Sequence, residues 1–262
     1  MKTENIKIQP QWTKSKEEIW NEKFADLEDN SQKKQIHLYK RPFFYYAGIA
    51  AVILVIILPS VAFFYTENII IPRGKHHTVN FPDGSQVVIN AESKLTYKPL
   101  WWRISREVNL EGEAFFTVEK GNKFEVHSGS GNVMVLGTSF NILSRSGRYE
   151  VACFNGKVKV EVGTQSTVLT KGMQTVYKDS LLKTTENINI EEKISWANNR
   201  FAFHNEPLIN VIREIERQYN IEVVIPANTD YIYSGNFTKL DNPEQVLQIV
   251  QEPFGIQLKI KD

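Results

Sequence analysis

Few residues of this chain have the type and spacing that covalent chemistry requires. One candidate is the pair Gly137-Thr138, because a hydroxyl that follows a glycine can attack the preceding carbonyl of a strained peptide, which gives an N-to-O acyl shift and chain cleavage. The alternative is a strand turn in which Gly137 fits the backbone and Thr138 bonds locally. No zinc-protease helix, phosphate-binding loop or nucleophile elbow occurs. The sequence therefore predicts a protein that is not an enzyme, with self-cleavage left open.

Side chains that could bind a metal or form a redox site are also few. His76 and His77 are adjacent, and neighbouring residues of an extended chain point in opposite directions, so the pair is not expected to chelate one ion. Cys153 is the single cysteine, which excludes an intrachain disulfide and favours a buried, unreactive thiol in a strand. We expect no metal site and no cofactor.

Composition limits the class of partner. Lysine and arginine number 31 against 30 acidic residues, for a net charge of +1, so the chain has no basic field of the kind that nucleic-acid binding needs. The hydrophobic content of 42% is enough for a packed core. We expect an ordered protein that makes no direct contact with nucleic acid.

The apolar segment 43–65 contains no charged residue and is long enough to span a bilayer as a helix. Tyr45 and Tyr46 near one end and Tyr65 at the other suit the two membrane interfaces. A buried core helix is one alternative. A cleaved signal peptide is another, because Ser60-Val61-Ala62 has the form of a cleavage site and follows Pro59, but the preceding segment is unusually long for one.

Basic residues flank the apolar segment unevenly, which predicts its orientation. Two directly precede it and two lie a little earlier, whereas the two that follow are several residues away. We expect a single-pass protein of the inner membrane with a cytoplasmic N-terminus and a periplasmic remainder after Thr66. The basic residues in question are Lys33, Lys34, Lys40 and Arg41 before the segment, and Arg73 and Lys75 after it.

The tail, residues 1–41, is too short for a core of its own but carries a helix signal. Ser15 and Glu18 form a capping-box pattern, so a helix should begin at Ser15. An isolated helix with an uncovered apolar face is marginal in water, so we expect this one to fold on a partner. The alternative is a helix lying on the membrane surface. The expected contact residues are Ile19, Trp20, Phe24 and Leu27, with Trp12 extending the contact.

Residues 66–180 have the pattern of an all-β domain. Short runs of β-branched and aromatic residues recur every eight to twelve positions, separated by turn residues. Pro82-Asp83-Gly84 and Asn155-Gly156 supply the backbone angles that tight reversals require. The pattern predicts an all-β domain, as either a sandwich or a solenoid of short strands.

Several strings in this domain carry a family resemblance. They are the segments 81–85, 89–93, 95–97, 108–118 and 135–141, followed by Gly156-Lys157-Val158. In order and spacing they resemble the FecR family of transmembrane anti-sigma regulators, and some proteins resembling this chain are thought to cut themselves at such a Gly-Thr pair. The residues that match the family pattern are Pro82, Asp83, Gly84, Asn90, Gly112, Glu113, Gly137, Thr138 and Phe140.

Residues 190–262 contain an internal repeat. Seven apolar positions between Val211 and Ile225 recur between Val246 and Ile260, and each copy reads as a helix followed by a strand. Asn205 and Asp241 occupy expected N-cap positions, and Asn220 and Gly255 are expected helix stops. The spacing predicts an α+β domain of two β-α-β repeats.

The resemblance gives this last part a role. It resembles the C-terminal domain of Bacteroidetes-type family members, itself similar to the short N-terminal signalling domain of secretins and TonB-dependent transporters. A small capping domain without a partner is the alternative.

Taken with the topology, the resemblance implies an anti-sigma factor. The tail would sequester an extracytoplasmic-function sigma factor, and the periplasmic domains would receive a signal from the signalling domain of a TonB-dependent outer-membrane transporter. Stepwise proteolysis would then free the sigma factor, with Thr66–Ile71 as an exposed juxtamembrane target and Pro59 loosening the membrane helix. The alternative is a membrane-tethered periplasmic binding or scaffolding module without a sigma partner.

Overall fold

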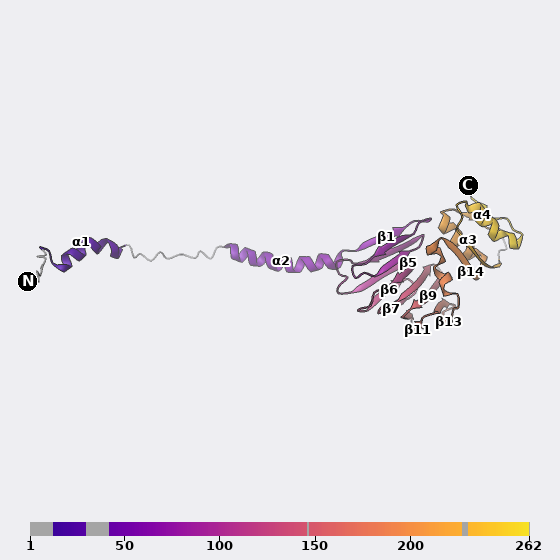
Figure 1. Cartoon of the computed structure of the whole chain (residues 1–262), viewed down its shortest axis with the longest axis horizontal. Coiled ribbons are helices and arrows are strands. Elements are labelled where there is room, and N and C mark those ends of the chain that lie inside the picture. The colour runs from indigo at the N-terminus through magenta and orange to yellow at the C-terminus, as the bar shows by residue number, and fades with distance from the viewer. Residues whose placement is uncertain (1–12, 30–41, 146, 227–229, 262) are drawn as a thin grey trace, which may run out of the picture. The chain divides into compact units, whose positions relative to one another are not determined.

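The structure is a computed structural model that describes residues 13–29, 42–145, 147–226 and 230–261. It divides into two compact units, Met1–Val55 and Ile56–Asp262. Helices α1 (Lys16–Asp29) and α2 (Pro42–Phe64) precede the strands, as Figure 1 shows. Among the described residues, one helical stretch, Phe44–Phe64, is long and apolar enough to cross a membrane. Pro59 lies inside α2, and the helix continues past it.

Thirteen strands form a sheet that folds into two layers. Almost all neighbouring strands are antiparallel, the exception being the parallel pair of β5 and β6. The layer that we call sheet A contains β1 (Glu67–Ile71), β4 (Ser93–Tyr97), β6 (Phe124–Ser128), β7 (Asn132–Val135), β10 (Lys157–Val162) and β11 (Gln165–Thr170). The layer that we call sheet B contains β2 (His77–Asn80), β3 (Gln86–Ile89), β8 (Ser139–Arg145), β9 (Arg148–Asn155), β12 (Met173–Lys178) and β13 (Leu181–Glu186).

The long strand β5 (Arg106–Thr117) belongs to both layers. Its first half pairs with β4 and β6 of sheet A, and its second half pairs with β3 and β8 of sheet B. The change occurs at Gly112, which has a φ of +112°. A Cβ at this position would lie 2.4 Å from Ser93 Oγ, so a side chain cannot be accommodated where the strand turns the corner.

The opposite margins of the two layers also meet. The Gln165 amide at the start of β11 donates to the Ser180 carbonyl at 2.8 Å and accepts from the Leu182 N–H at 2.9 Å. The hydroxyls of Thr167 and Thr184 lie 3.1 Å apart. The sheet is therefore nearly closed and barrel-like, which rules out the solenoid alternative.

A single core fills the space between the two layers. Alternate residues of β5 point inward, and aromatic side chains from several strands fill the centre. Cys153 is fully buried in β9, and this burial raises the pKa of its thiol to about 11, which confirms the expectation of a buried strand cysteine. The largest fully buried aromatic side chains are Phe116, Phe124, Phe140 and Tyr149.

The C-terminal part has a second core and a strand-helix-strand order in each half. The 3-10 segment η1 (Ile190–Asn198) leads into the first half, and both helices turn their apolar faces onto one hydrophobic cluster. The first half consists of β14 (Arg200–Pro207), α3 (Leu208–Tyr219) and β15 (Val223–Val224). The second consists of β16 (Ile232–Thr238), α4 (Pro243–Gln251), the short η2 (Glu252–Phe254) and β17 (Lys259–Ile260).

Strand pairing links the two halves of this domain. Strand β14 pairs with β16, and β15 pairs with β17, both antiparallel. The helix stops are confirmed, because Asn220 ends α3 and Gly255 ends η2, both in the left-handed conformation.

The two expected N-caps are wrong. Asn205 lies in a bulge of β14, which stays paired with β16 as far as Pro207, so α3 begins only at Leu208. In the second half the cap is Asn242, whose side chain accepts from the Glu244 N–H at 2.8 Å. Asp241 is one residue too early for that bond.

Candidate functional site

Helix α1 begins as its sequence predicts. The Glu18 N–H donates to Ser15 Oγ at 3.2 Å, and the Ser15 N–H donates to a Glu18 carboxylate oxygen at 2.9 Å, which is the reciprocal capping box. The apolar stripe is exposed, with Trp20 56% and Phe24 39% accessible. These two rings stack with centroids 4.7 Å apart. The helix therefore presents an ordered aromatic surface.

The other expected contact residues are placed less completely. Ile19 is half-buried on the same helix. Leu27 belongs to the last turn of α1, although its side chain is outside the described residues, as is Trp12 altogether. The basic residues that predicted the orientation of the membrane helix, Lys33, Lys34, Lys40 and Arg41, also lie outside the described residues.

The Pro82-Asp83-Gly84 motif forms the turn between β2 and β3. Asp83 accepts from the Ser85 N–H and hydroxyl at 3.1 and 2.9 Å and from Arg106 at 2.8 Å. Burial alone would raise the pKa of Asp83, but these bonds lower it below its ordinary value. Gly84 has a φ of +88°, as a tight turn requires. The motif thus ties a hairpin of sheet B to the start of β5.

Gly137 and Thr138 connect β7 to β8. The φ of Gly137 is +152°, and a Cβ there would lie 2.8 Å from Lys120 Cα, so glycine is required. Thr138 is buried, its hydroxyl donates to the Lys157 carbonyl at 3.1 Å, and its backbone bonds to Val118. These contacts suit a strand turn, and self-cleavage stays a prediction.

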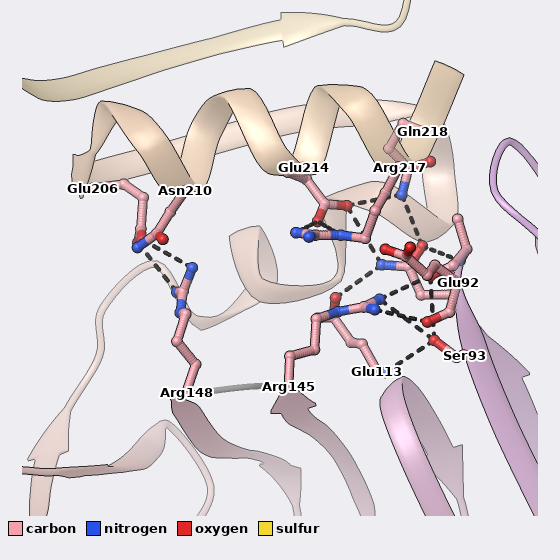
Figure 2. Close-up of polar contacts among 12 residues, drawn as sticks. Glu92, Ser93, Glu113, Arg145, Arg148, Glu206, Asn210, Glu214, Arg217 and Gln218 are labelled. Atoms are coloured by element: carbon pink, nitrogen blue, oxygen red, sulfur yellow. Dashed lines mark hydrogen bonds and ion pairs between the residues drawn. The ribbon is translucent and has the colours of Figure 1, made fainter. Parts of the chain in front are cut away.

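Two further motif residues, Asn90 and Glu113, meet in a polar cluster on the outer face of sheet B. Glu113 is buried and its carboxylate accepts from the Asn90 amide at 2.8 Å and from the Asn141 amide at 2.9 Å. Nearby, the Arg145 guanidinium donates to the Ala91 and Glu92 carbonyls, both at 2.8 Å. Figure 2 shows Glu113 and Arg145 facing α3.

Helix α3 contributes the other residues of this cluster, Glu214, Arg217 and Gln218. Gln218 donates from its amide to Asn90 Oδ1 at 2.7 Å and to Glu214 at 2.8 Å, and its own Oε1 lies 2.8 Å from His76 Nε2. Glu214 also accepts from Arg217 at 2.6 Å. Gln218 is 2% exposed, so its amide is a buried link between the two domains (Figure 2).

The pKa values of the two glutamates of the cluster, Glu113 and Glu214, are shifted in opposite directions. Burial and then the nearby Glu214 carboxylate raise the pKa of Glu113. Burial also opposes ionisation of Glu214, but Arg217 and Arg145 outweigh it and lower its pKa. One acid of the pair therefore holds a proton more readily than the other.

A second polar contact lies further along sheet B. Arg148 pairs with Glu150 at 2.7 Å within β9 and with Glu206 of β14 at 2.9 Å, and Glu206 in turn accepts from Asn210 at 2.6 Å. Lys193 of η1 pairs with Glu150 at 2.8 Å. Burial opposes the ionised form of Glu150, but its two cationic partners lower its pKa to about 2.

A cavity of ≈150 Å³ separates these two contacts, and six cationic and five acidic side chains line it. Three buried polar atoms on its lining residues have no protein partner among the described residues: Asn141 Oδ1, Arg145 Nε and Trp196 Nε1. The contact between the domains at this cavity is therefore polar, in contrast to the two hydrophobic cores.

Sequence reasoning found only part of this cluster. Asn90 and Glu113 stood out through the family pattern, but Arg145, Glu150, Glu214 and Gln218 did not, because charged residues on an amphipathic strand or helix read as solvent-facing. His76, which was not expected to chelate an ion together with His77, bonds to Gln218 and lies with its ring 5.5 Å from that of Trp196. Among the described residues no group of acidic, His or Cys side chains could hold a metal ion.

The segment Thr66–Ile71, expected to be an exposed juxtamembrane target, is exposed on one face only and is mostly a paired strand. Residues Glu67–Ile71 form β1, which pairs with β4 along its whole length. Ile69 packs against the core and Ile71 is buried within it. The period-two pattern of this segment buries one face of a paired strand, whereas Asn68 and Ile70 on the other face stay exposed.

Comparison with known proteins identifies relatives in both domains. The model described as FecR protein matches residues 67–159, and the model described as FecR, C-terminal matches residues 200–262, together more than half of the chain. No curated protein matches.

Two crystal structures are similar, each of a candidate anti-sigma factor from Parabacteroides distasonis ATCC 8503. One has a TM-score of 0.71 and 28% identity, and the match covers 76% of this chain and 96% of the other. The second has a TM-score of 0.70 and 27% identity, with 75% and 95% covered.

Proposed function

The chain belongs to the FecR family, and we propose that it is a membrane-anchored anti-sigma factor. In this proposal α2 spans the inner membrane once, with the N-terminus in the cytoplasm and the strand-rich domains in the periplasm. The tail binds an extracytoplasmic-function sigma factor and keeps it from RNA polymerase. The observation that carries the proposal is the exposed Trp20–Phe24 stack on a capped helix, in a chain whose structural relatives are described as candidate anti-sigma factors.

The surface of α1 suits a helix-in-groove contact. Aromatic side chains are the residues that most often dominate such interfaces, because they bury a large area at little cost in conformational entropy. The capping box fixes the residue at which the helix starts, so the two rings would be presented to a partner in a defined register. Helix α1 also carries Glu17, Glu18 and Glu22, which suits a protein partner better than an anionic lipid surface.

The outer domains would receive the signal. The C-terminal domain has short two-stranded sheets, and Val224 and Ile232 on these strands are exposed, which leaves apolar edge surface for a partner strand. The proposed partner is the signalling domain of a TonB-dependent outer-membrane transporter. Its binding would act on the polar contact between α3 and sheet B.

Release of the sigma factor would follow proteolysis near the membrane. Because β1 is paired with β4, a protease could reach this segment only after the strand leaves the sheet. The proposed relay therefore runs from the C-terminal domain to sheet B, and from the sheet to β1. Pro59 within α2 would assist a later cut inside the membrane.

The direct test is co-purification of the full chain from cells of the source organism. Replacing Trp20→Ala and Phe24→Ala should reduce the recovered sigma factor by about tenfold or more, because both rings would be lost from the contact. The matched control is Glu22→Ala, an exposed residue on the side of α1 that faces away from the two rings. Equal recovery of the sigma factor with the unchanged chain, the Trp20/Phe24 variant and the control variant would contradict the proposed contact.

Absence of any sigma factor from the unchanged chain would have a different meaning. It would favour a membrane-tethered periplasmic binding or scaffolding module. The polar cavity beside α3 would then be the first place to look for a ligand.

A further inference from the structure

The turn between β4 and β5, residues 98–105, exposes large apolar side chains. Leu100 is 60% and Ile104 69% accessible, although they belong to a domain with a well-filled core. Exposed apolar side chains grouped on one short turn are a feature of contact surfaces. We refer to this turn as the 98–105 turn.

The exposure is not the result of a loose segment. Within the turn, the Ile104 and Ser105 N–H groups both donate to the Trp101 carbonyl, at 2.9 and 3.1 Å. Trp102 is 2% exposed and stacks on Phe81 with centroids 4.5 Å apart. This buried ring anchors the turn to the core, so Leu100 and Ile104 are held in the open by a rigid base.

The 98–105 turn lies beside the end of the membrane helix. The rings of Trp101 and Phe63 are 5.4 Å apart in an edge-to-face arrangement, and Lys98 Nζ lies 3.9 Å from the Phe63 ring centroid. Phe63 is the second-last residue of α2. If the apolar stretch Phe44–Phe64 crosses a bilayer, the turn is at the depth where hydrocarbon gives way to headgroups.

The composition of the turn suits that depth. Tryptophan is favoured at membrane interfaces, and lysine and arginine extend their charged ends toward lipid phosphates while their stems stay among apolar groups. Neither Lys98 nor Arg103 forms an ion pair with a described residue. Both cations are therefore available for headgroups.

We infer that the 98–105 turn docks the β-rich domain onto the bilayer that α2 spans, with Leu100 and Ile104 inserted at the interface and Lys98 and Arg103 on anionic phospholipid headgroups. This inference goes beyond the proposed function and does not depend on a sigma factor. The docked turn and the helix end would form two attachments to the same membrane surface. The pairing of β1 with β4 would be held close to the lipid, because Glu67 at the start of β1 is paired with Tyr97, the residue directly before the turn.

The test measures the depth of residue 104 in the full chain reconstituted into bilayers of phosphatidylethanolamine with phosphatidylglycerol. An environment-sensitive dye is attached at Ile104→Cys, and nitroxide-bearing lipids are added as quenchers. The dye should be quenched about threefold more strongly than the same dye at Ile188→Cys, a fully exposed site near η1. A third chain labelled at Phe64→Cys reports the end of α2, and the wild type, whose only thiol is the buried Cys153, is the labelling blank.

Two further chains make the test specific. In the chain labelled at position 104, Leu100→Asp should return the quenching toward that of position 188, because a carboxylate resists insertion. Lys98→Glu with Arg103→Glu should do the same only when phosphatidylglycerol is present. Quenching at position 104 no stronger than at position 188, in bilayers where position 64 is quenched, would overturn the inference. Absence of quenching at position 64 would overturn it too, because α2 would then not lie in the bilayer.

Discussion

Glu113 is a residue whose ionised form is disfavoured by its surroundings in the folded chain. It is buried against Glu214, and its raised pKa means that the folded chain binds a proton more tightly than the unfolded chain. In the pH range just above 4.5, its ordinary value, the folded state therefore holds more protons. The free energy of unfolding should fall as pH rises through this range, up to the pKa of Glu113 in the folded chain.

Replacing Glu113→Gln should remove that fall. Glutamine keeps one acceptor for Asn90, and a rotation of the Asn141 amide turns its unpartnered Oδ1 toward the new NH2 group. We expect the variant to be at least as stable as the wild type at neutral pH, with a flatter profile, measured by thermal unfolding from about pH 4 to about pH 8. Glu111→Gln, exposed two residues earlier on β5, is the control. An unchanged slope in Glu113→Gln would contradict the assignment.

The pKa of Glu150 is shifted in the opposite direction, so its contribution to stability changes with pH in the opposite sense. Its folded pKa of about 2 lies below the ordinary 4.5, so its ionised form stabilises the folded chain above pH 4.5, and this stabilisation is lost as pH falls from 4.5 toward 2. Glu150→Gln should lower the free energy of unfolding by about 2 kcal/mol at neutral pH, because Lys193 and Arg148 would lose a half-buried anionic partner. Urea unfolding at about pH 7 and about pH 3 checks this, since the difference should shrink in acid. A difference that persists undiminished at the lower pH would exclude charge as its cause.

Among the elements, β5 depends on one residue without a side chain. Gly112→Ala would place a Cβ 2.4 Å from Ser93 Oγ and 2.8 Å from its Cα, at a φ that alanine rarely adopts. The sheet would have to open at its corner, so we expect a loss of about 3 kcal/mol or more in urea unfolding. Gly129→Ala is the matched control, because a Cβ there meets nothing within 4 Å. Equal stability of the two variants would mean that the corner is not fixed by this contact.

Local signals in the sequence predicted several element boundaries correctly. The capping box of α1 and the left-handed stop at Asn220 each depend on residues within one helical turn. They can therefore be predicted from the sequence without knowledge of the fold. The start of α3 is not, because pairing of β14 with a strand about thirty residues later holds the chain extended through Asn205. Burial of β1 has the same origin, since its partner β4 supplies the bonds.

The candidate site was harder to predict for a related reason. The bonds that join Asn90 and Gln218 connect residues 128 positions apart, and neither side chain carries a local signal of burial. An outer strand face with Glu113 and Asn141, and a helix with Glu214 and Gln218, each read as ordinary polar surfaces. Only their apposition makes them a site. The exposed stripe of α1 could be read from the sequence because its apolar residues lie close together along one helix.

At the scale of the whole unit Ile56–Asp262, two hydrophobic cores are joined across a polar cavity. The barrel-like domain and the C-terminal domain each have a continuous hydrophobic cluster of their own. Between the polar clusters on sheet B and α3 lies a cavity that charged side chains of both signs line. The contact is consequently the part of this unit that should yield first to a partner, and Gln218 is its central link.

Gln218→Glu tests this link with almost no change of shape. The new carboxylate could no longer donate to Asn90 or Glu214 and would add a third acid beside Glu113 and Glu214, so the domains should separate at lower temperature. In calorimetry of the full chain, we expect the C-terminal domain to unfold in a transition of its own, ahead of the barrel-like domain. Acidification should reverse part of the effect, because the introduced carboxyl group can donate again once it is protonated.

The matched control for this change is Gln251→Glu, on α4. Gln251 uses its carbonyl oxygen to accept from the Leu258 N–H at 2.6 Å, and a carboxylate keeps that acceptor. The control should therefore unfold as the wild type does, although it makes the same chemical change. If both variants kept the wild-type profile, the contact between α3 and sheet B would be held by other bonds, and a signal arriving at the C-terminal domain could not be relayed by releasing Gln218.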